Sequence, residues 1–218
     1  MSSTRAVIFD LDGVLVDSER LHIDAWRELF ARERFEVSPN VFRHAIGQSD
    51  ISFLEELFAA RGIQRPVMPW LLEKKKILDR LLQQQAQAFP GAQNLVHALR
   101  GHYRLAVASS SWRDSIKLAL ERLHLATDFD AIVGKDDVKR HKPDPEVYIE
   151  AARRLAVPPS ECVAIEDSLY GIDAALAARM RCIAVAHSLP PERLSRAHLV
   201  VPSLTERDSI LRFLNHSP

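Results

Sequence analysis

The sequence contains only two cysteines in 218 residues, Cys162 and Cys182. Each opens an apolar run, which indicates buried reduced thiols rather than a disulfide framework. The first residues, MSSTRAVIFD, have neither a long apolar segment nor a small-residue cleavage site, and no run approaches the roughly 18 apolar residues of a membrane span. We therefore expect a soluble cytoplasmic protein with no membrane partner.

Neither sign of charge is in surplus, because 29 Lys and Arg side chains balance 29 Asp and Glu side chains. A chain with no basic surplus and no aromatic-rich platform is a poor candidate for nucleic-acid binding. Coiled-coil heptads are also absent, which favours a monomer. A charged ligand must therefore be held by a local group of side chains rather than by an overall field.

Short apolar runs recur along the chain and predict strands that are buried on both faces. Helical patterns separate them, for example Ser115 to Leu125 and Ala151 to Leu155, as expected of a parallel sheet covered by helices. We predict an α/β fold with a Rossmann-like, doubly wound parallel sheet. The predicted strands are Ala6 to Phe9, Leu105 to Ala108, Ala131 to Val133, Cys162 to Ile165, Cys182 to Ala186 and Leu199 to Val201.

One interval is too long for a simple crossover, because about 90 residues separate the first two predicted strands. Amphipathic helical patterns fill it, beginning with Leu21, Ala25 and Leu29. We expect residues 17–87 to form an inserted helical domain, and residues 1–16 and 88–218 to form the Rossmann-like core. The Pro90-Gly91 turn signal marks the return to the core.

Polar side chains follow four of the predicted strands, at the edge where ligands bind in open α/β sheets. Four acids, Asp10, Asp12, Glu166 and Asp167, stand closest to the strand ends, and two unit charges 4 Å apart repel by about 4 kcal/mol at an effective dielectric near 20. A cation must offset them, and oxygen-only ligands favour Mg²⁺ together with a phosphate. The groups are Asp10 and Asp12, Ser109 to Ser111, His141 to Pro145, and Glu166 with Asp167.

Four ordered signatures, DLDGVLVDS, the strand-end Ser109, HKPDP and IEDS, resemble those of the haloacid dehalogenase superfamily. The similarity spans nearly the whole chain. The inserted helices resemble the small helical cap of the branch that contains β-phosphoglucomutase and related phosphatases. Four signatures in order, each at a strand end, are highly specific.

The resemblance implies a role for each matching position. Asp10 is the expected nucleophile, which forms an aspartyl-phosphate, and Asp12 is the expected general acid and base. Ser109 and Lys142 are expected to hold phosphoryl oxygens. The implied Mg²⁺ ligands are the Asp10 side chain, the Asp12 backbone carbonyl and Asp167, with Glu166 as a direct or water-mediated ligand.

Each signature also has a purely structural interpretation. Ser111 with Asp114 resembles a helix capping box, and Asp144 before Pro145 resembles a helix start. Glu166 and Asp167 could cap the following helix, although their position against a buried strand favours metal binding. The run Lys74 to Lys76 is typical of a solvated helix face.

Individual residues also indicate which of the superfamily's reactions this chain is expected to catalyse. Asp12 argues against a dehalogenase, because a halide leaving group needs no proton, and the first cap helix lacks the lysine of phosphonatases. A β-phosphoglucomutase-type mutase is harder to exclude. Asp50 and Trp112-Arg113 stand where that enzyme is expected to bind a second phosphate, and an aspartate there would repel it. We therefore expect hydrolysis of a small phosphorylated metabolite, such as a sugar phosphate.

A receiver-like signalling domain is a remote alternative, because it also carries strand-end acids and a phosphorylatable aspartate. The inserted helices argue against it, since a switch needs no cap that excludes water. The residues expected to contact substrate beyond the phosphoryl group are His22, Gln48, Ser49, Asp50, Lys76, Ser110 and Arg113.

Overall fold

The computed structural model describes residues 3–38, 40–42 and 49–216. These residues form two compact units, a core of residues 1–17 and 87–218 and a helical unit of residues 18–86. The expected insertion of residues 17–87 is one residue longer at each end than the helical unit.

A six-stranded sheet forms the centre of the core, and every strand pair in it is parallel. The predicted doubly wound α/β fold is therefore confirmed. The strands lie in the order β3-β2-β1-β4-β5-β6. They are β1 (Ala6–Phe9), β2 (Arg104–Ala108), β3 (Ala131–Val133), β4 (Cys162–Glu166), β5 (Arg181–Val185) and β6 (Leu199–Val201).

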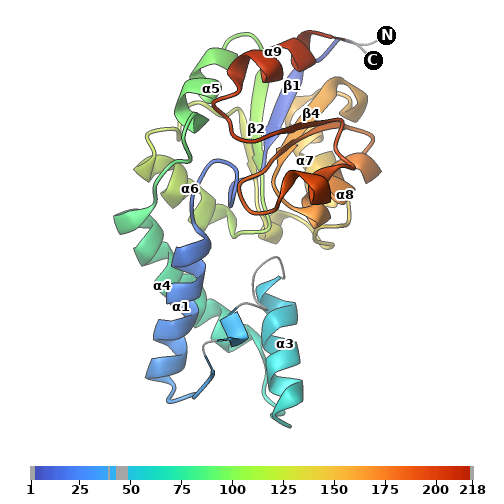
Figure 1. Cartoon of the computed structure of the whole chain (residues 1–218). Helices are drawn as coiled ribbons and strands as arrows, with labels where there is room; N and C mark the ends of the chain where they lie inside the picture. Colours follow the sequence, from blue (N-terminus) through green and yellow to red (C-terminus); the bar gives the residue numbers. More distant parts are fainter. Residues whose placement is uncertain (1–2, 39, 43–48, 217–218) are drawn as a thin grey trace. The chain divides into compact units, whose positions relative to one another are not determined.

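Helices cover both faces of this sheet, with α5 and α9 on one side and α7 and α8 on the other (Figure 1). Residues of α7 and α8 share one apolar cluster with alternate residues of the strands, such as Ala6 and Ile8 of β1. All four residues of β1 are buried, as expected of a strand enclosed on both faces. The core helices are α5 (Ala92–Leu99), α6 (Arg113–Arg122), α7 (Glu146–Leu155), α8 (Leu169–Ala177) and α9 (Arg207–Asn215).

Three short 3₁₀ helices complete the core, η1 (Lys135–Asp137), η2 (Pro159–Glu161) and η3 (Pro191–Leu194). Helix α6 begins two residues earlier than the predicted Ser115 and ends at Arg122 rather than Leu125. The apolar pattern extends past the helix because Leu123 and Leu125 are both buried, although His124 between them has φ 57°.

The strand order reverses between β1 and β4, which lie side by side at the centre of the sheet. The chain runs outward from β1 through β2 to β3, and then returns to β4 on the other side of β1. A crevice opens at such a switch point, outside the carboxyl ends of the strands. The topology therefore places the residues that follow β1 and β4 at the usual ligand position of this fold class.

The helical unit contains α1 (Glu19–Arg32), α3 (Asp50–Ala60) and α4 (Met68–Gln85). Aromatic rings fill its interior, and Trp26 stacks on Phe30 with ring centroids 5.3 Å apart. Trp70 of α4 contacts Phe30, Phe35 and Phe58. Such contacts add about 0.5–1.5 kcal/mol each beyond the burial of their area. No helix in the described part of the chain is long and apolar enough to cross a membrane.

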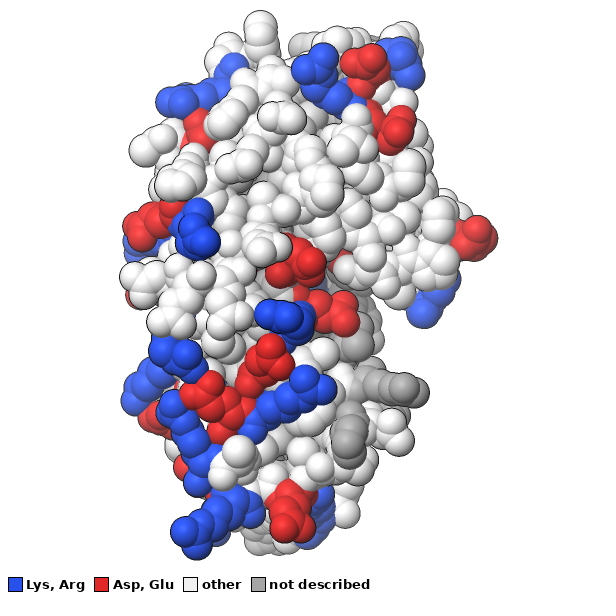
Figure 2. Space-filling view, turned by 60° about the vertical axis from the view of Figure 1, so that its left-hand side comes forward, with Lys and Arg blue, Asp and Glu red and all other residues white. Residues whose placement is uncertain are grey.

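Acidic and basic side chains are interspersed on the face drawn in Figure 2, as the balanced composition leads one to expect. Many charged side chains of the described residues form local pairs, such as Arg153 and Arg154 with Glu150 on α7. Exposed pairs of this kind contribute at most about 1 kcal/mol each to stability.

Gly91 begins α5 with φ 87°, and a Cβ atom there would lie 2.7 Å from the backbone of Leu204 and Thr205. Gly101 has a similar φ of 83° but nothing within 4 Å of the equivalent position. Alanine at a left-handed position costs about 1–2 kcal/mol, so we expect Gly101→Ala to lower Tm by roughly 2–8 °C. Gly91→Ala also forces the backbone apart, and we expect at least twice that decrease. Differential scanning calorimetry measures both, and equal decreases would contradict the packing argument.

Candidate active site

The register of the sheet brings acidic residues from two strands together. Phe9 of β1 pairs with Ile165 of β4, so the next residues, Asp10 and Glu166, stand side by side. Asp167 follows directly, and the carboxylates of these three acids lie within 4.8 Å of one another. All three residues are buried. Among the described residues, these three acids form a group whose carboxylate oxygens are close enough together to bind one metal ion.

Lys142 reaches this cluster from the loop between β3 and α7. Its Nζ donates hydrogen bonds of 2.6 Å to Asp10 Oδ1 and to Glu166 Oε1, and a third of 3.0 Å to the carbonyl of Ala108. Its side chain is only 6% exposed. One buried cation is therefore shared by two carboxylates, and all three of its protons are donated.

Burial and the neighbouring charges shift the pKa values of Asp10, Asp167 and Lys142. Burial raises the pKa of Asp10 well above its usual range, against the lowering effect of Lys142, and Glu166 and Asp167 raise it further. Burial and the charge of Glu166 raise the pKa of Asp167 to about 7. The two carboxylates raise the pKa of Lys142 against the effect of its burial. A single lysine does not neutralise the acids, so the cluster favours an additional cation.

Glu166 accepts hydrogen bonds at both oxygens. Its Oε1 accepts from Lys142 and, at 2.6 Å, from the hydroxyl of Tyr148 in α7. Its Oε2 accepts from the backbone N–H of Asp167 and from the hydroxyl of Ser168, each at 3.2 Å. A carboxylate offers about four lone-pair positions. The carboxylate of Glu166 is therefore saturated by protein donors.

The start of α8 is built around the same carboxylate. Ser168 caps this helix, because its Oγ accepts a hydrogen bond from the N–H of Gly171. A Cβ atom at position 171 would lie 1.9 Å from Cδ of Glu166. Helix α8 can therefore approach the acid this closely only with glycine at that position. The alternative interpretation, in which Glu166 or Asp167 caps the following helix, is therefore wrong, because Ser168 caps α8.

Asp12 lies in the turn after β1 and contacts two serines from the end of β2. The hydroxyl of Ser111 donates to Asp12 Oδ2 at 2.7 Å, and that of Ser109 lies 3.4 Å from the same atom. The capping-box interpretation of Ser111 is wrong, because α6 begins after Trp112 and no side chain caps it. Ser109 is buried and also accepts from the N–H of Ser111.

The loop that carries Lys142 is held by acidic side chains at the start of α7. Glu146 accepts from the N–H groups of Lys139 and Arg140 at 3.0 Å. Asp144 accepts from the N–H of Glu146, also at 3.0 Å. The helix starts one residue later than predicted, so Pro145 rather than Asp144 immediately precedes it. The expected helix-starting contact of Asp144 is nevertheless made.

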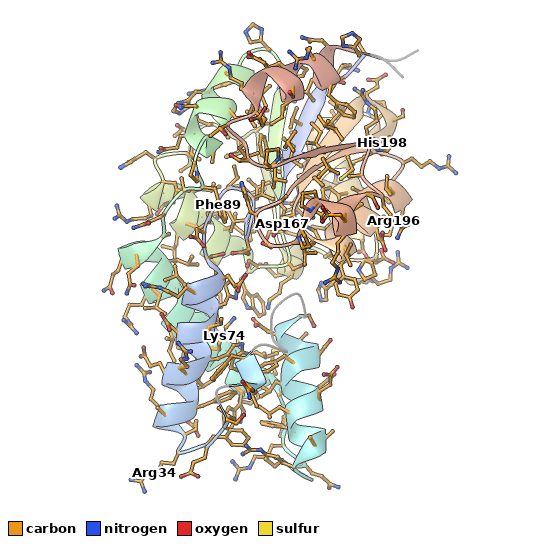
Figure 3. The ribbon with its side chains drawn as sticks, in the orientation of Figure 1. Arg34, Lys74, Phe89, Asp167, Arg196 and His198 are labelled. Atoms are coloured by element: carbon orange, nitrogen blue, oxygen red, sulfur yellow. The ribbon has the colours of Figure 1, made fainter. Side chains whose placement is uncertain are left out.

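Two of the candidate substrate residues in the helical unit, His22 and Asp50, contact the same lysine, Lys74. Lys74 Nζ lies 2.8 Å from both carboxylate oxygens of Asp50 and 2.9 Å from Nδ1 of His22. Lys74 is only 1% exposed and lies within the unit (Figure 3), so the solvated interpretation is wrong for this lysine. Asp50, expected to repel a phosphate, instead forms an ion pair.

The remaining candidates have simpler surroundings. Lys76 is exposed and pairs with Glu73, so Lys74 and not Lys76 is the lysine of the run that contacts His22 and Asp50. Ser49 is exposed and caps α3. Gln48 lies outside the described residues. In the core, Ser110 is exposed, and Arg113 Nη1 lies 3.4 Å from Asp137 Oδ1, an atom that also accepts from Arg154.

Two contacts of the cluster were missed by the sequence reasoning. The Tyr148 hydroxyl holds Glu166, and the Ser188 hydroxyl donates to Asp167 Oδ2. Figure 3 shows Asp167 and Phe89 toward the same end of the core. Ser188 follows β5, so a fifth strand end contributes to the site. The polar His187-Ser188 pair directly after the apolar run CIAVA was the signal available for it.

Comparison with known proteins decides the family. The model described as "Haloacid dehalogenase-like hydrolase" matches residues 7–185. The chain belongs to this family. The resemblance inferred from the four signatures is thereby confirmed, and so is the expectation of a hydrolase. The acids that cluster in the core lie in two of the signatures that first indicated the family, and Lys142 lies in a third.

Individual relatives support the same assignment. Protein SUPPRESSOR OF QUENCHING 1, chloroplastic, from Arabidopsis thaliana is 37% identical over 191 residues, which cover 84% of this chain but only 18% of the plant protein. A phosphorylated carbohydrates phosphatase from Thermotoga maritima is 34% identical over 190 residues, which cover 84% of this chain and 86% of the relative. The crystal structure of a β-phosphoglucomutase from Clostridium difficile matches with a TM-score of 0.82 at 26% identity and covers 97% of both chains.

The raised pKa values predict how divalent cations bind to the acidic cluster. Below about pH 7, Asp167 carries a proton that a cation must displace. We therefore expect Mg²⁺ affinity to fall as the pH is lowered from 8 to 6, by up to about tenfold per pH unit for each displaced proton. Isothermal titration calorimetry in two buffers of different ionisation enthalpy measures both affinity and proton release. An unchanged affinity with no proton release would contradict this prediction.

Proposed function

We propose that this protein is a Mg²⁺-dependent phosphatase that hydrolyses a small phosphomonoester through an aspartyl-phosphate on Asp10. The observation that carries the proposal is the buried Asp10 carboxylate, held by Lys142 at the switch point of the sheet and surrounded by further acids. The name of the Thermotoga relative supports a phosphorylated sugar as the substrate class.

In the first step, the Asp10 carboxylate attacks the phosphorus atom. A bond forms between an Asp10 oxygen and phosphorus, and the bond from phosphorus to the substrate oxygen breaks. Asp12 gives its proton to that leaving oxygen. A carboxylate is an effective nucleophile here because it needs no base to activate it, and the bond from Lys142 fixes its orientation.

In the second step, water attacks the phosphorus atom and Asp12 accepts its proton, so that inorganic phosphate leaves and the Asp10 carboxylate is restored. The hydrogen bond of 2.7 Å from the Ser111 hydroxyl to Oδ2 of Asp12 supports this role, because it fixes the direction of the Asp12 carboxyl group. Positioned acid and base groups of this kind contribute about 10²–10⁴-fold to rate.

The residues present fit a divalent cation, since the donors are hard carboxylate oxygens, and burial together with the neighbouring acids raises the pKa values of Asp10 and Asp167. Asp10, Asp167 and the backbone carbonyl of Asp12 are the proposed ligands. Bound Mg²⁺ supplies positive charge that lets a phosphate dianion approach the carboxylates. Glu166 is better suited to orient Lys142 than to bind the metal directly, because four protein donors occupy its oxygens.

Lys142 and Ser109 are proposed to hold phosphoryl oxygens as the phosphate arrives. Lys142 is protonated under all working conditions, because the neighbouring carboxylates raise its pKa. It can therefore offset charge on the transferring group throughout the reaction. We further propose that the helical unit is the substrate-selecting cap, which the chain enters and leaves through paired segments at Val16 and Ala88.

Replacement of the proposed nucleophile tests the mechanism. We expect Asp10→Asn to lower kcat by at least 10³-fold, because an amide is not a competent nucleophile. A coupled assay for inorganic phosphate, run with Mg²⁺ and a panel of sugar phosphates, measures the rate. The matched control is Asp130→Asn, in the same unit but away from the acidic cluster, with expected activity within about twofold of wild type.

Two outcomes of this experiment would contradict the proposal. Retained turnover in Asp10→Asn would remove Asp10 from the nucleophile role. A wild-type protein that takes up one equivalent of phosphate and then stops would instead indicate the receiver-like alternative, because an enzyme releases many equivalents.

A phosphosugar mutase is the second candidate, favoured by the structural match to a β-phosphoglucomutase. A mutase must hold a second phosphate at the far end of its substrate. The candidate cations in this chain already have acidic partners, since Lys74 pairs with Asp50 and Arg113 with Asp137. A second phosphate would have to compete with these carboxylates, which favours hydrolysis of monophosphates.

The products distinguish the two activities. With a hexose 1-phosphate as substrate and the corresponding bisphosphate as activator, we expect inorganic phosphate to accumulate, with less than about 1% of the turnover giving hexose 6-phosphate. ³¹P NMR resolves all of these species in one sample, and Asp10→Asn provides the blank. Interconversion of the two hexose phosphates faster than phosphate release would contradict a phosphatase.

A further inference from the structure

The segment after β5 contacts two other parts of the core besides Asp167. Nδ1 of His187 lies 2.9 Å from the carbonyl oxygen of Gly13, in the turn that carries Asp12. The His187 ring also stacks on Phe89, with ring centroids 4.0 Å apart and an interplanar angle of 16°. One side chain therefore joins the turn after β1 to the segment that returns from the helical unit.

The partners of His187 define its tautomer. A carbonyl oxygen can only accept, so Nδ1 must carry the proton that forms the bond to Gly13. Nε2 is buried and has no hydrogen-bond partner among the described residues. Burial lowers the pKa of His187, although the bond to Gly13 and the charge of Asp17 act in the opposite direction. The ring is thus a neutral imidazole that donates in one fixed direction.

The residues on either side of this contact are themselves bound together. Gly13 has φ 83°, and its N–H donates to the carbonyl of Val16 at 3.0 Å. Val16 forms an antiparallel bridge with Ala88, and the N–H of Phe89 donates to the carbonyl of Leu15 at 3.1 Å. The segment that leaves the core near Val16 and the segment that returns at Ala88 therefore form a short antiparallel ribbon. His187 is hydrogen-bonded to Gly13, just before the first segment, and stacks on Phe89 of the second.

We infer that His187 is a positioning residue for the proton transfer carried out by Asp12. Its hydrogen bond fixes the Gly13–Val14 peptide group, the second peptide group after Asp12, and its stack on Phe89 fixes the ring that makes this bond. This inference rests on the proposed function. Ser188, the next residue, holds Asp167, so adjacent residues of one loop orient the proton donor and the acidic cluster separately.

Leaving groups of different basicity test this role directly. An alkyl phosphate such as glycerol phosphate needs a proton from Asp12 as it leaves, whereas p-nitrophenyl phosphate releases an anion that is stable without one. The value of kcat/KM reports the steps up to phosphoryl transfer to Asp10. A misplaced Asp12 therefore lowers kcat/KM for the alkyl substrate while sparing the aryl substrate. Loss of fold or of the acidic cluster lowers both.

Three variants separate the two contacts of His187. His187→Phe keeps a ring to stack on Phe89 but removes the donor, and we expect kcat/KM to fall about tenfold for glycerol phosphate and less than threefold for p-nitrophenyl phosphate. His187→Asn places an amide N–H where Nδ1 stood, and we expect it to recover most of the alkyl activity. Phe89→Leu keeps the donor, and we expect an intermediate, leaving-group-dependent loss.

The kinetic results that would contradict the role of His187 differ from those that would contradict the proposed function. Equal losses on both substrates in His187→Phe, or no loss on either, would overturn the positioning role. So would failure of His187→Asn to exceed His187→Phe on glycerol phosphate. If the wild-type protein with Mg²⁺ hydrolyses neither these two substrates nor any member of the sugar phosphate panel, the proposed function fails instead. Circular dichroism and Tm of each variant establish that the kinetic comparison concerns folded protein.

Discussion

The site depends on one buried lysine, Lys142, which is shared by Asp10 and Glu166. The register of β1 and β4 places these two acids side by side. Lys142 donates to Asp10 and Glu166 within an environment that excludes most water. Two unit charges 4 Å apart interact by about 4 kcal/mol at an effective dielectric near 20, so removing the lysine would leave several such repulsions unopposed. The cluster is therefore stable only as a set that includes a cation.

Glycine positions and neighbouring hydroxyl groups make that set possible. The carboxylates approach the backbone so closely that a Cβ atom at Gly13 would lie 2.0 Å from Asp167 Oδ2, and Gly171 is equally close to Glu166. Tyr148 and Ser188 then fill hydrogen-bonding positions that a buried carboxylate cannot leave empty without a penalty of about 1–3 kcal/mol. The acids are thus fixed in direction before any ligand arrives, which is the condition for electrostatic catalysis.

The sequence predicted the sheet well because strands buried on both faces read as uninterrupted apolar runs, and β1 and β3 match their predicted bounds. Helix ends were predicted less well, as at α6, where buried Leu123 and Leu125 continue the apolar pattern beyond the last turn. The strand-end acids were visible because charge rarely follows such a run. Tyr148 was not visible, because an aromatic residue on an amphipathic helix looks like ordinary core until its hydroxyl is seen to bond Glu166.

A single sequence does not show which charged side chains will pair with one another in the folded protein. Asp50 taken alone indicates repulsion of a phosphate, but in the folded helical unit Lys74 holds it. The basis for preferring a monophosphate therefore changes. Under the proposed function, a second phosphate would have to compete with the carboxylate that each candidate cation already pairs with, so a ligand would gain only the difference between the two interactions. Lys142 differs from these cations because it is shared by two carboxylates and lies beside a third acid, Asp167, so the negative charge around it exceeds its own positive charge.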